Sequence, residues 1–207
     1  MEFRVRKVLI GLVLFGFASF VVAAEEAFDQ KGWVVGGGVG TAMLSIKPKN
    51  QPQLKSANEN TTLYTVFGGY NFTDWFGIEF DVSKSSDFTD VNTGFDAYIV
   101  GTSFTPKFTH HFNKDFAVYF KPGFQYIAYE QTIEASHQYD ITWNGIDPFV
   151  GVGLQYSFPP GIRVRLDYKY SNITLDRSEN SIYGYDLYDE EIDLVFSAIS
   201  FTANYQF

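Results

Sequence analysis

The chain has 207 residues, no cysteine and a formal net charge of −9 at pH 7, and 19% of its residues are aromatic. An acidic chain is a poor candidate for nucleic-acid binding, because phosphate backbones require basic patches. The lack of cysteine excludes disulfides, so the fold itself must supply the stability.

The first segment has the features of an export signal. Arg4, Arg6 and Lys7 precede an apolar run from Val8 to Val22, and small residues follow at Ala23 and Ala24. The alternative is a membrane anchor, but the run is shorter than the roughly 20 apolar residues that a spanning helix needs. We therefore predict a signal peptide over residues 1–24, cleaved after Ala24. Without it, 15 − 3 = 12 basic and 24 − 1 = 23 acidic residues leave a net charge of −11.

The rest of the chain, residues 25–207, alternates apolar and polar residues with a period of two, which is typical of β-strands. The predicted strands are Gly32–Ile46, Thr61–Phe72, Phe76–Lys84, Phe95–Phe112, Phe116–Glu130, Ile141–Phe158, Ile162–Ile173 and Ile192–Phe207. Three connections are short and rich in turn residues, at 73–75, 113–115 and 159–161. The other four are longer and polar, at 47–60, 85–94, 131–140 and 174–191.

Short and long connections alternate strictly along the chain. This is the pattern of an all-β, eight-stranded, antiparallel up-and-down barrel in the bacterial outer membrane, with short periplasmic turns and long extracellular loops. An even number of strands places both termini in the periplasm. The predicted location is thus the outer membrane of a Gram-negative cell, in contact with its lipid and lipopolysaccharide.

The phase of each strand separates an apolar face from a charged one. Phe76, Ile78, Phe80 and Val82 alternate with Glu79 and Asp81, for example. The apolar face must meet lipid, because Lys or Arg at the bilayer midplane costs roughly 2–4 kcal/mol. The predicted polar network of the lumen is Glu79, Asp81, Lys107, Lys121, Gln125, Gln155, Arg163, Arg165, Asp167 and Lys169.

A soluble eight-stranded barrel would reverse these faces, and periodicity alone does not separate the two. The signal segment, the aromatic residues at strand ends and the terminal Phe207 favour the membrane form. Pro106 and Pro122 lie on the apolar face in mid-strand and each removes a ladder donor, so we predict a bulge or local distortion at both. The glycines at 36, 37, 38 and 40 lack the residues of a nucleotide loop and instead allow the first strand to bend.

The last strand carries its own signal. Phe201, Ala203, Tyr205 and Phe207 alternate on one face and end at an aromatic residue. In a barrel this strand pairs with the first one and leaves no sticky edge. These four residues are predicted to be the signal that the barrel-assembly machinery reads during biogenesis.

Several segments resemble the transmembrane domain of OmpA-type proteins. They are Phe67–Asn71 with Trp75–Phe80, Pro148–Tyr156 with Arg165–Asn172, Asn204–Phe207, and Trp33. The resemblance implies a small outer-membrane barrel with a structural or surface-interaction role. One departure is Gln155, which stands where relatives often carry an acid, and another is that the chain stops at Phe207, before the peptidoglycan-binding domain that many relatives carry.

Two uses of the lumen network remain open. In an eight-stranded barrel the side chains nearly fill the interior, so mixed charges favour a buried ion-pair plug and a monomeric, structural protein. The alternative is a small low-conductance porin that passes ions or small solutes. Neither use requires a cofactor, and no cofactor or metal is expected.

An enzyme is disfavoured by the residue pattern. Tyr170-Ser171-Asn172 superficially resembles the Ser-Asn of lipid A deacylases, but Lys169 stands where those enzymes need a histidine base. His110 and His111 are adjacent strand residues and point to opposite faces, so they do not chelate one metal together. The acidic loop 174–191 is predicted to be a solvated loop; the sharper alternative is a surface for adhesion, for a host ligand or for divalent cations.

Overall fold

The computed structural model describes residues 31–48, 57–89, 96–134, 138–158, 161–177 and 191–207. The predicted signal segment and its cleavage site lie outside these residues, as does most of the four long connections. Among the described residues, no helix is both long and apolar enough to cross a membrane.

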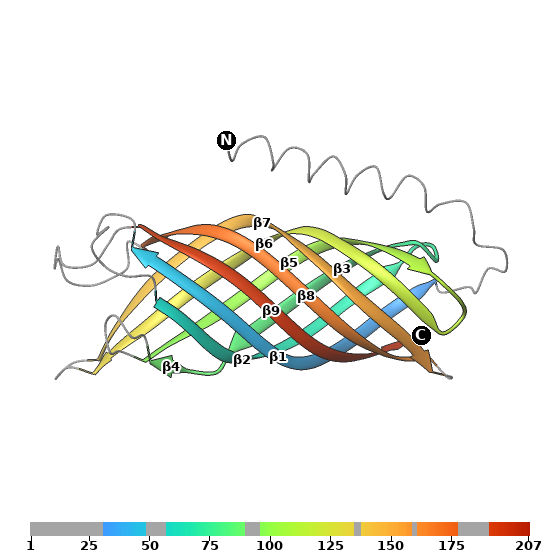
Figure 1. Cartoon of the computed structure of the whole chain (residues 1–207), viewed down its shortest axis with the longest axis horizontal. Helices are drawn as coiled ribbons and strands as arrows, with labels where there is room; N and C mark the ends of the chain where they lie inside the picture. The colour runs from blue at the N-terminus through green and yellow to red at the C-terminus, as the bar shows by residue number, and fades with distance from the viewer. Residues whose placement is uncertain (1–30, 49–56, 90–95, 135–137, 159–160, 178–190) are drawn as a thin grey trace.

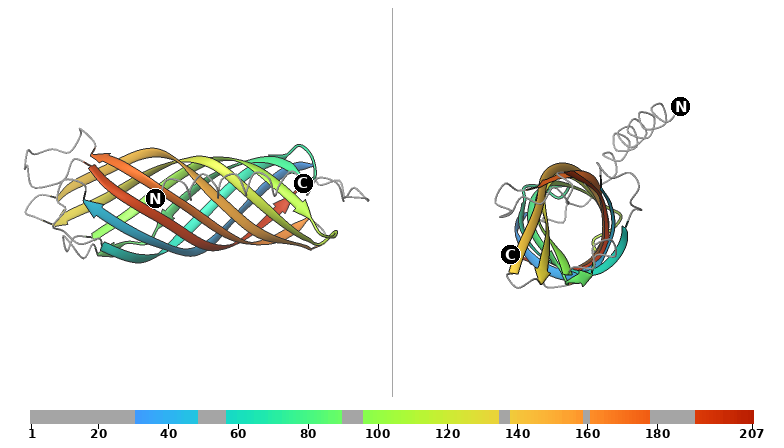
Figure 2. Two further views of the ribbon diagram at one scale, coloured as in Figure 1. Left: turned by 45° about the horizontal axis from the view of Figure 1, so that its top comes forward. Right: turned by 90° about the vertical axis from the view of Figure 1, so that its left-hand side faces the viewer.

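The described chain consists of antiparallel strands that close into a barrel (Figures 1 and 2). The strands are β1 Gly32–Pro48, β2 Ala57–Asn71, β3 Phe76–Ser85, β4 Phe88–Thr89, β5 Asp96–His111, β6 Phe116–Glu134, β7 Gln138–Phe158, β8 Ile162–Arg177 and β9 Glu191–Gln206. Strands next to one another in sequence pair in the sheet, except that β3 pairs with β5 rather than with β4, and β1 pairs with β9 to complete the ring. The predicted eight-stranded up-and-down barrel is confirmed, with β4 as a short addition beside β5.

The short turns form one end of the barrel, here called the short-turn end. Thr73 Oγ1 accepts a hydrogen bond from Phe76 N at 3.0 Å, and Asn113 Oδ1 accepts one from Phe116 N at 2.8 Å. Gly161 adopts a φ of 75°, a left-handed conformation that glycine tolerates best. These side chains and this glycine are the turn chemistry that the sequence predicted.

The opposite end, where β1 stops at Pro48 and β9 starts at Glu191, is called the long-loop end. The larger differences between the predicted and the observed strand bounds all occur at this end. β2 begins at Ala57 rather than 61, β6 runs to Glu134 rather than 130, and β8 runs to Arg177 rather than 173. The barrel is therefore longer than its apolar alternation indicated.

Two stretches of the wall lack regular ladder pairs. Between β5 and β6 the pairs stop at Phe104↔Phe124 and resume at Phe108↔Phe120, across Pro106 and Pro122. The register is unchanged on both sides, so the prolines produce the predicted local distortion without a bulge. β7 and β8 are similarly interrupted between Phe149↔Ser171 and Asn144↔Asp176, where Asp147 Oδ2 accepts a bond from Thr174 N at 3.3 Å.

The outer wall next to the short-turn end is apolar, as predicted. Phe80, Phe104 and Phe124 are each more than half exposed, and so is Phe201 of β9. Aromatic residues gather at the rim of this end: Trp33, Phe72, Trp75, Phe112, Phe158 and Phe207 are all exposed. An exposed apolar band bounded by aromatic residues is the lipid-facing surface of a membrane barrel.

The long-loop end shows the reverse arrangement. Its interior is a cluster of buried apolar residues, which includes Leu44, Ile99, Ile127, Tyr129, Trp143, Ile173, Leu175, Ile192, Leu194 and Phe196. Its outer wall carries exposed polar residues such as Asn58, Thr62, Asp96, Asn172 and Asp176. This part of the barrel follows the soluble pattern, with apolar side chains inside and polar ones outside. The strand phase predicted only polar residues in the lumen, so this apolar half was not predicted.

Candidate functional site

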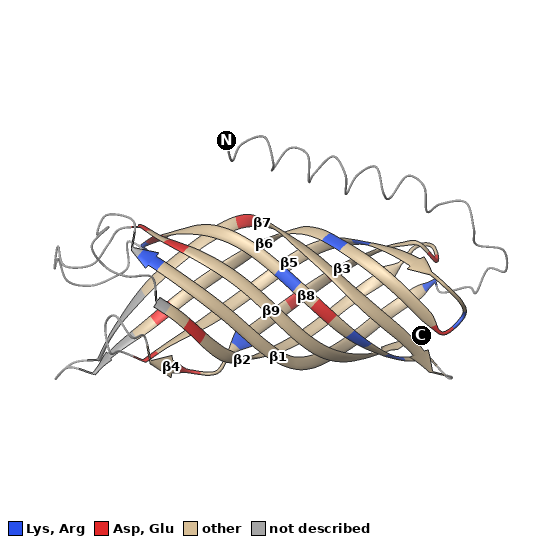
Figure 3. Cartoon of the chain, viewed as in Figure 1, with Lys and Arg blue, Asp and Glu red and all other residues tan. Residues whose placement is uncertain are grey.

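The polar half of the lumen holds the residues that the strand phase predicted. Glu79, Lys107, Gln125, Gln155, Arg163, Arg165 and Asp167 are buried, and Asp81, Lys121 and Lys169 are half-buried. In Figure 3 the charges of β8 alternate near the middle of the barrel. All ten belong to inward positions on β3, β5, β6, β7 and β8.

Glu79 and Arg165 form the centre of the network. Arg165 Nη1 and Nη2 donate to the two carboxylate oxygens of Glu79 at 2.9 and 3.1 Å. This two-pronged geometry is the strong form of an arginine–carboxylate pair. Lys107 Nζ lies 2.8 Å from Glu79 Oε1 and adds a second cation. The pair joins β3 to β8 directly across the lumen.

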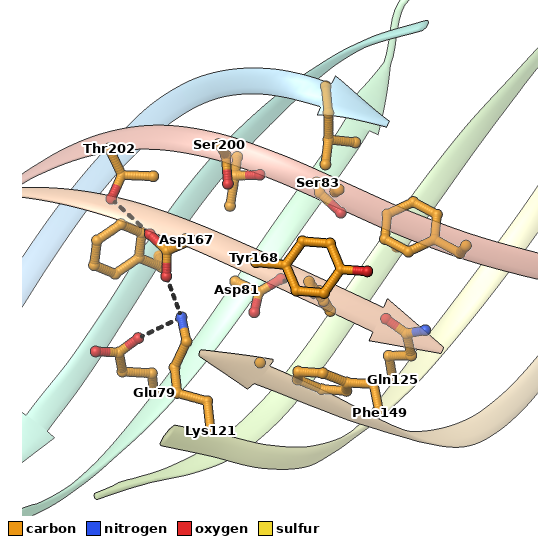
Figure 4. A pocket seen from close by; sticks show the side chains of 18 of the residues that line it. Glu79, Asp81, Ser83, Lys121, Gln125, Phe149, Asp167, Tyr168, Ser200 and Thr202 are labelled. Carbon is orange, nitrogen blue, oxygen red and sulfur yellow. Dashed lines mark hydrogen bonds and ion pairs between the residues drawn. The ribbon is translucent and has the colours of Figure 1, made fainter. Parts of the chain in front are cut away.

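Asp167 is the second anionic centre. Its Oδ1 accepts from Lys121 Nζ at 2.9 Å and from the Tyr119 hydroxyl at 2.6 Å, and its Oδ2 accepts from Thr202 Oγ1 at 3.2 Å. Figure 4 shows Lys121 between Glu79 and Asp167, with Thr202 on the far oxygen of Asp167. Both carboxylates thus have several donors each, which a buried charge requires.

Aromatic rings pack around the cations. The Arg165 guanidinium lies 4.4 Å from the centre of the Phe67 ring and 5.0 Å from that of Tyr119. Lys169 Nζ lies 4.2 Å from the Phe149 ring centre. Such contacts hold a cation over a ring face and exclude water from it.

A second polar layer lies further from the short-turn end. Asp81 accepts a hydrogen bond from Ser103 and lies 3.6 Å from Lys169 Nζ. Gln125 donates to Ser171. This leaves Ser171 bonded to an amide and Lys169 paired with an acid, which does not support a lysine-activated serine.

A cavity of about 50 Å³ lies beside this layer, with Asp81, Gln125, Lys169 and Phe196 among its lining residues. It has room for a few water molecules, since one water needs roughly 10–15 Å³. Its lining includes Glu79 and Arg165 as well as members of the apolar cluster such as Ile99 and Ile127, so the cavity lies between the two.

Four contributors to the network were not predicted: Tyr119, Thr202, Ser103 and Phe67. Tyr119 lies on the same face of β6 as Lys121, and Thr202 lies on the inward face of β9. Their positions in the alternation of the strands were sufficient to place these side chains inside the barrel. The predicted network comprised charged and amide side chains, whereas hydroxyl groups and aromatic rings complete it.

The histidines behave differently from each other. His111 Nε2 lies 3.1 Å from the carbonyl oxygen of Asp74, and the His110 ring packs edge-on against Phe112 at 5.1 Å. Within the described residues, no group of three or more His, Cys, Asp or Glu side chains is arranged to hold a metal ion.

The closing strand places its aromatic residues as the alternation predicted. Phe201, Tyr205 and Phe207 are exposed on the outer wall, and the Tyr205 and Phe207 rings stack with centres 6.1 Å apart. Trp33 N and Phe207 N each donate to the other residue's carbonyl oxygen at 3.1 Å, which ties the last strand to the first.

A closed barrel with a polar network inside and an apolar band outside defines an integral membrane barrel. The profile of the outer membrane protein beta-barrel domain matches residues 10–207, so the chain belongs to that family and is an integral outer-membrane protein. None of the curated protein sequences compared with the chain matches it.

Several solved outer-membrane barrels have a similar fold. Neisserial surface protein A covers 88% of this chain and 100% of its own, with a TM-score of 0.60 and 15% identity. OprG from Pseudomonas aeruginosa covers 87% and 99%, with a TM-score of 0.59 and 16% identity. Ail of Yersinia pestis, solved with the heparin analogue sucrose octasulfate, covers 84% and 99%, with a TM-score of 0.51 and 14% identity. At these identities the likeness is one of fold.

Proposed function

We propose that this protein is a monomeric, non-catalytic outer-membrane barrel of OmpA-like type, with a closed lumen and a structural and surface-interaction role. The observation that carries the proposal is the layer around Glu79 and Arg165. Both side chains are almost completely buried and joined by two hydrogen bonds across the barrel. A buried, paired charge layer blocks solutes, because opening it would expose unpaired charges in the lumen.

The apolar cluster supports the same proposal. Leu175 and Leu194 are fully buried at the long-loop end and pack with Trp143 and Phe196. Water and ions would have to pass this cluster as well as the charged layer. Two barriers of different chemistry in series favour a closed barrel over an open pore.

In the proposed orientation the short-turn end and both termini face the periplasm, and the long-loop end faces the exterior. The exposed aromatic rim at the short-turn end then lies at the inner interface of the membrane, in contact with lipid. The polar outer wall of the long-loop end lies among the lipopolysaccharide head groups or above them. Phe201, Ala203, Tyr205 and Phe207 would serve recognition by the assembly machinery.

The long loops are the proposed contact surface for a host or surface ligand. A neighbour of the same fold, Ail, was solved with a heparin analogue. In this chain, the loop over residues 174–191 has six acidic residues and one arginine, and it would repel a sulfated ligand. Any sulfated ligand would therefore have to bind elsewhere, such as the lysine-bearing loop 47–60.

The proposal is tested by single-channel recording of the refolded barrel, residues 25–207, in a planar lipid bilayer. Slower or faster migration of the unheated protein on a gel, relative to the heated one, checks that it has folded. We expect a folded barrel without discrete current steps. Reproducible steps from the folded wild type would overturn the closed-lumen proposal.

The second candidate is a small low-conductance pore, and the cavity favours it. Lys121, Asp81 and Lys169 next to this cavity are 15–20% exposed, so part of the lumen is accessible to water. In this case the Glu79–Arg165 pair would act as a gate. The double variant Glu79→Gln, Arg165→Ala should then raise the conductance; if the pair is only structural, the variant should lose heat stability and remain silent.

A further inference from the structure

The lumen network has more positive than negative groups. Its members are three carboxylates (Glu79, Asp81, Asp167) and five cations (Lys107, Lys121, Arg163, Arg165, Lys169). The ion pairs of the carboxylates are made with four of the cations, and none is made with Arg163. Arg163 is nevertheless only 5% exposed. In this largely buried position, a guanidinium that makes no ion pair among the described residues can take its counter-charge from an anion in solution.

The neighbour of Arg163 on β9 is also unsatisfied. Arg163 pairs in register with Asn204, and both side chains are on the inward face. Asn204 is 5% exposed, and neither its Nδ2 nor its Oδ1 has a hydrogen-bond partner among the described residues. Buried polar atoms are nearly always bonded, so the two unbonded atoms of Asn204, in register with Arg163, point to a partner from solution, either water or an anion.

A third polar group completes the arrangement. On the other side of Arg163, the register places Ser157 of β7 opposite it. Gln155 Nε2 lies 3.5 Å from Ser157 Oγ, which leaves the hydroxyl proton available to donate. Guanidinium, amide and hydroxyl groups therefore come from three adjacent strands, one layer inside the short-turn end of the barrel.

We propose that Arg163, Asn204 and Ser157 bind a small oxyanion that carries a hydroxyl group, such as hydrogen phosphate. The anionic oxygens accept hydrogen bonds from the guanidinium and from Asn204 Nδ2, and the hydroxyl donates to Asn204 Oδ1. Arginine binds phosphate through paired, charge-assisted hydrogen bonds. Chloride supplies the negative charge and can accept from Asn204 Nδ2, but it has no proton to donate to Asn204 Oδ1.

The test is an NMR titration of the refolded barrel labelled with [15N]asparagine in detergent micelles. The side-chain amide pair of Asn204 is assigned by its disappearance in Asn204→Ser. Inorganic phosphate is added at constant ionic strength, with chloride as the matched salt. We expect the Asn204 signals to shift and saturate with phosphate, and to move little with chloride.

Variants show whether the response depends on Arg163. Arg163→Gln should abolish the saturable shift and Arg163→Lys should weaken it, because lysine keeps the charge but lacks the planar fork. Lys114→Gln removes one charge from an exposed turn at the same end and should leave the titration unchanged. An unsaturable response, an equal response to chloride, or an unchanged titration in folded Arg163→Gln or Arg163→Lys would each overturn the proposal.

Discussion

At the scale of the residue, the stability of the interior depends on multiple bonds to single carboxylates. Glu79 contacts Arg165, Lys107 and Lys121, and Asp167 contacts three donors besides Arg165. Among the described residues, removal of Glu79 therefore leaves Lys107 without an acidic partner and leaves Arg165 and Lys121 with Asp167 alone. The loss in the free energy of unfolding should exceed the contribution of any single hydrogen bond, because the remaining charges stay buried.

Glu79→Gln tests this dependence. We expect a loss of about 3–5 kcal/mol in the free energy of unfolding, the range found when one partner of a buried pair is removed. Urea unfolding from lipid vesicles, followed by tryptophan fluorescence, provides the measurement. Asp115→Asn in an exposed turn is the control, with an expected change within about 0.5 kcal/mol. Wild-type stability in Glu79→Gln would show that the network contributes nothing.

A pair of glycines on β7 tests the packing of the network. A Cβ at Gly153 would lie 2.3 Å from the Tyr119 ring and hydroxyl, whereas one at Gly151 would be no closer than 3.5 Å to its neighbours. Gly153→Ala should displace Tyr119 from Asp167 and cost about 1–3 kcal/mol by overpacking. Gly151→Ala should be tolerated. Equal unfolding free energies for the two variants would contradict this account.

At the scale of the element, the polarity of the two faces of a strand reverses along its length: the inward face changes from polar to apolar, and the outward face from apolar to polar. On β8, Arg165 and Asp167 face inward near the short-turn end, but Ile173 and Leu175 occupy the same inward face near the long-loop end. The outward face changes from Leu166 to Asn172 and Asp176 over the same distance. The strand thus passes from a lipid environment to an aqueous one.

Strand positions could be predicted from the sequence because alternation and turn residues are local signals. The phase change was not predicted, because alternation alone does not indicate which face meets water once a strand leaves the lipid. The signal was present in Ile173 and Leu175, which alternate with Asn172, Thr174 and Asp176. The ten polar lumen positions could be predicted from parity, but their partners depend on the three-dimensional arrangement of strands far apart in sequence.

Two substitutions on the outer face of β8 locate the edge of the lipid. Leu166→Arg should cost roughly 2–4 kcal/mol, the range for arginine near the bilayer midplane, whereas Asn172→Arg should cost little. Both positions face outward on the same strand, and Asn172 is exposed at the polar end. Unfolding from vesicles measures both. Similar large losses would mean that the lipid also covers Asn172.

At the scale of the whole molecule, closure depends on the seam between β1 and β9. The backbones approach so closely that a Cβ at Gly38 would lie 2.1 Å from the carbonyl oxygen of Phe201. A backbone atom has no alternative rotamer, so the seam itself would have to open. The glycine run of the first strand therefore allows the ring to close at its tightest contact.

Gly38→Ala should reduce the folded fraction of the refolded protein, as read from unheated gels. The control is Gly68→Ala, because a Cβ there would be 3.7 Å from its nearest neighbour and fits without rearrangement. The expected cost of Gly38→Ala is about 1–3 kcal/mol or more, from overpacking against backbone. A normal yield from Gly38→Ala together with a poor one from Gly68→Ala would contradict the role of the seam.

The distribution of charge among the strands has a consequence for the order of folding. The charged members of the network on β3 are both acids, Glu79 and Asp81, whereas those on β5 and β6 are both cations, Lys107 and Lys121. Glu79 and Arg165 are 86 residues apart and meet only when opposite walls face each other. An unfinished sheet that contains β3 and β5 already pairs Glu79 with Lys107, but it lacks the bonds from Glu79 to Arg165 of β8. This cross-lumen pair therefore forms only in the correctly closed ring, so the interior of this barrel distinguishes a completed fold from an incomplete one.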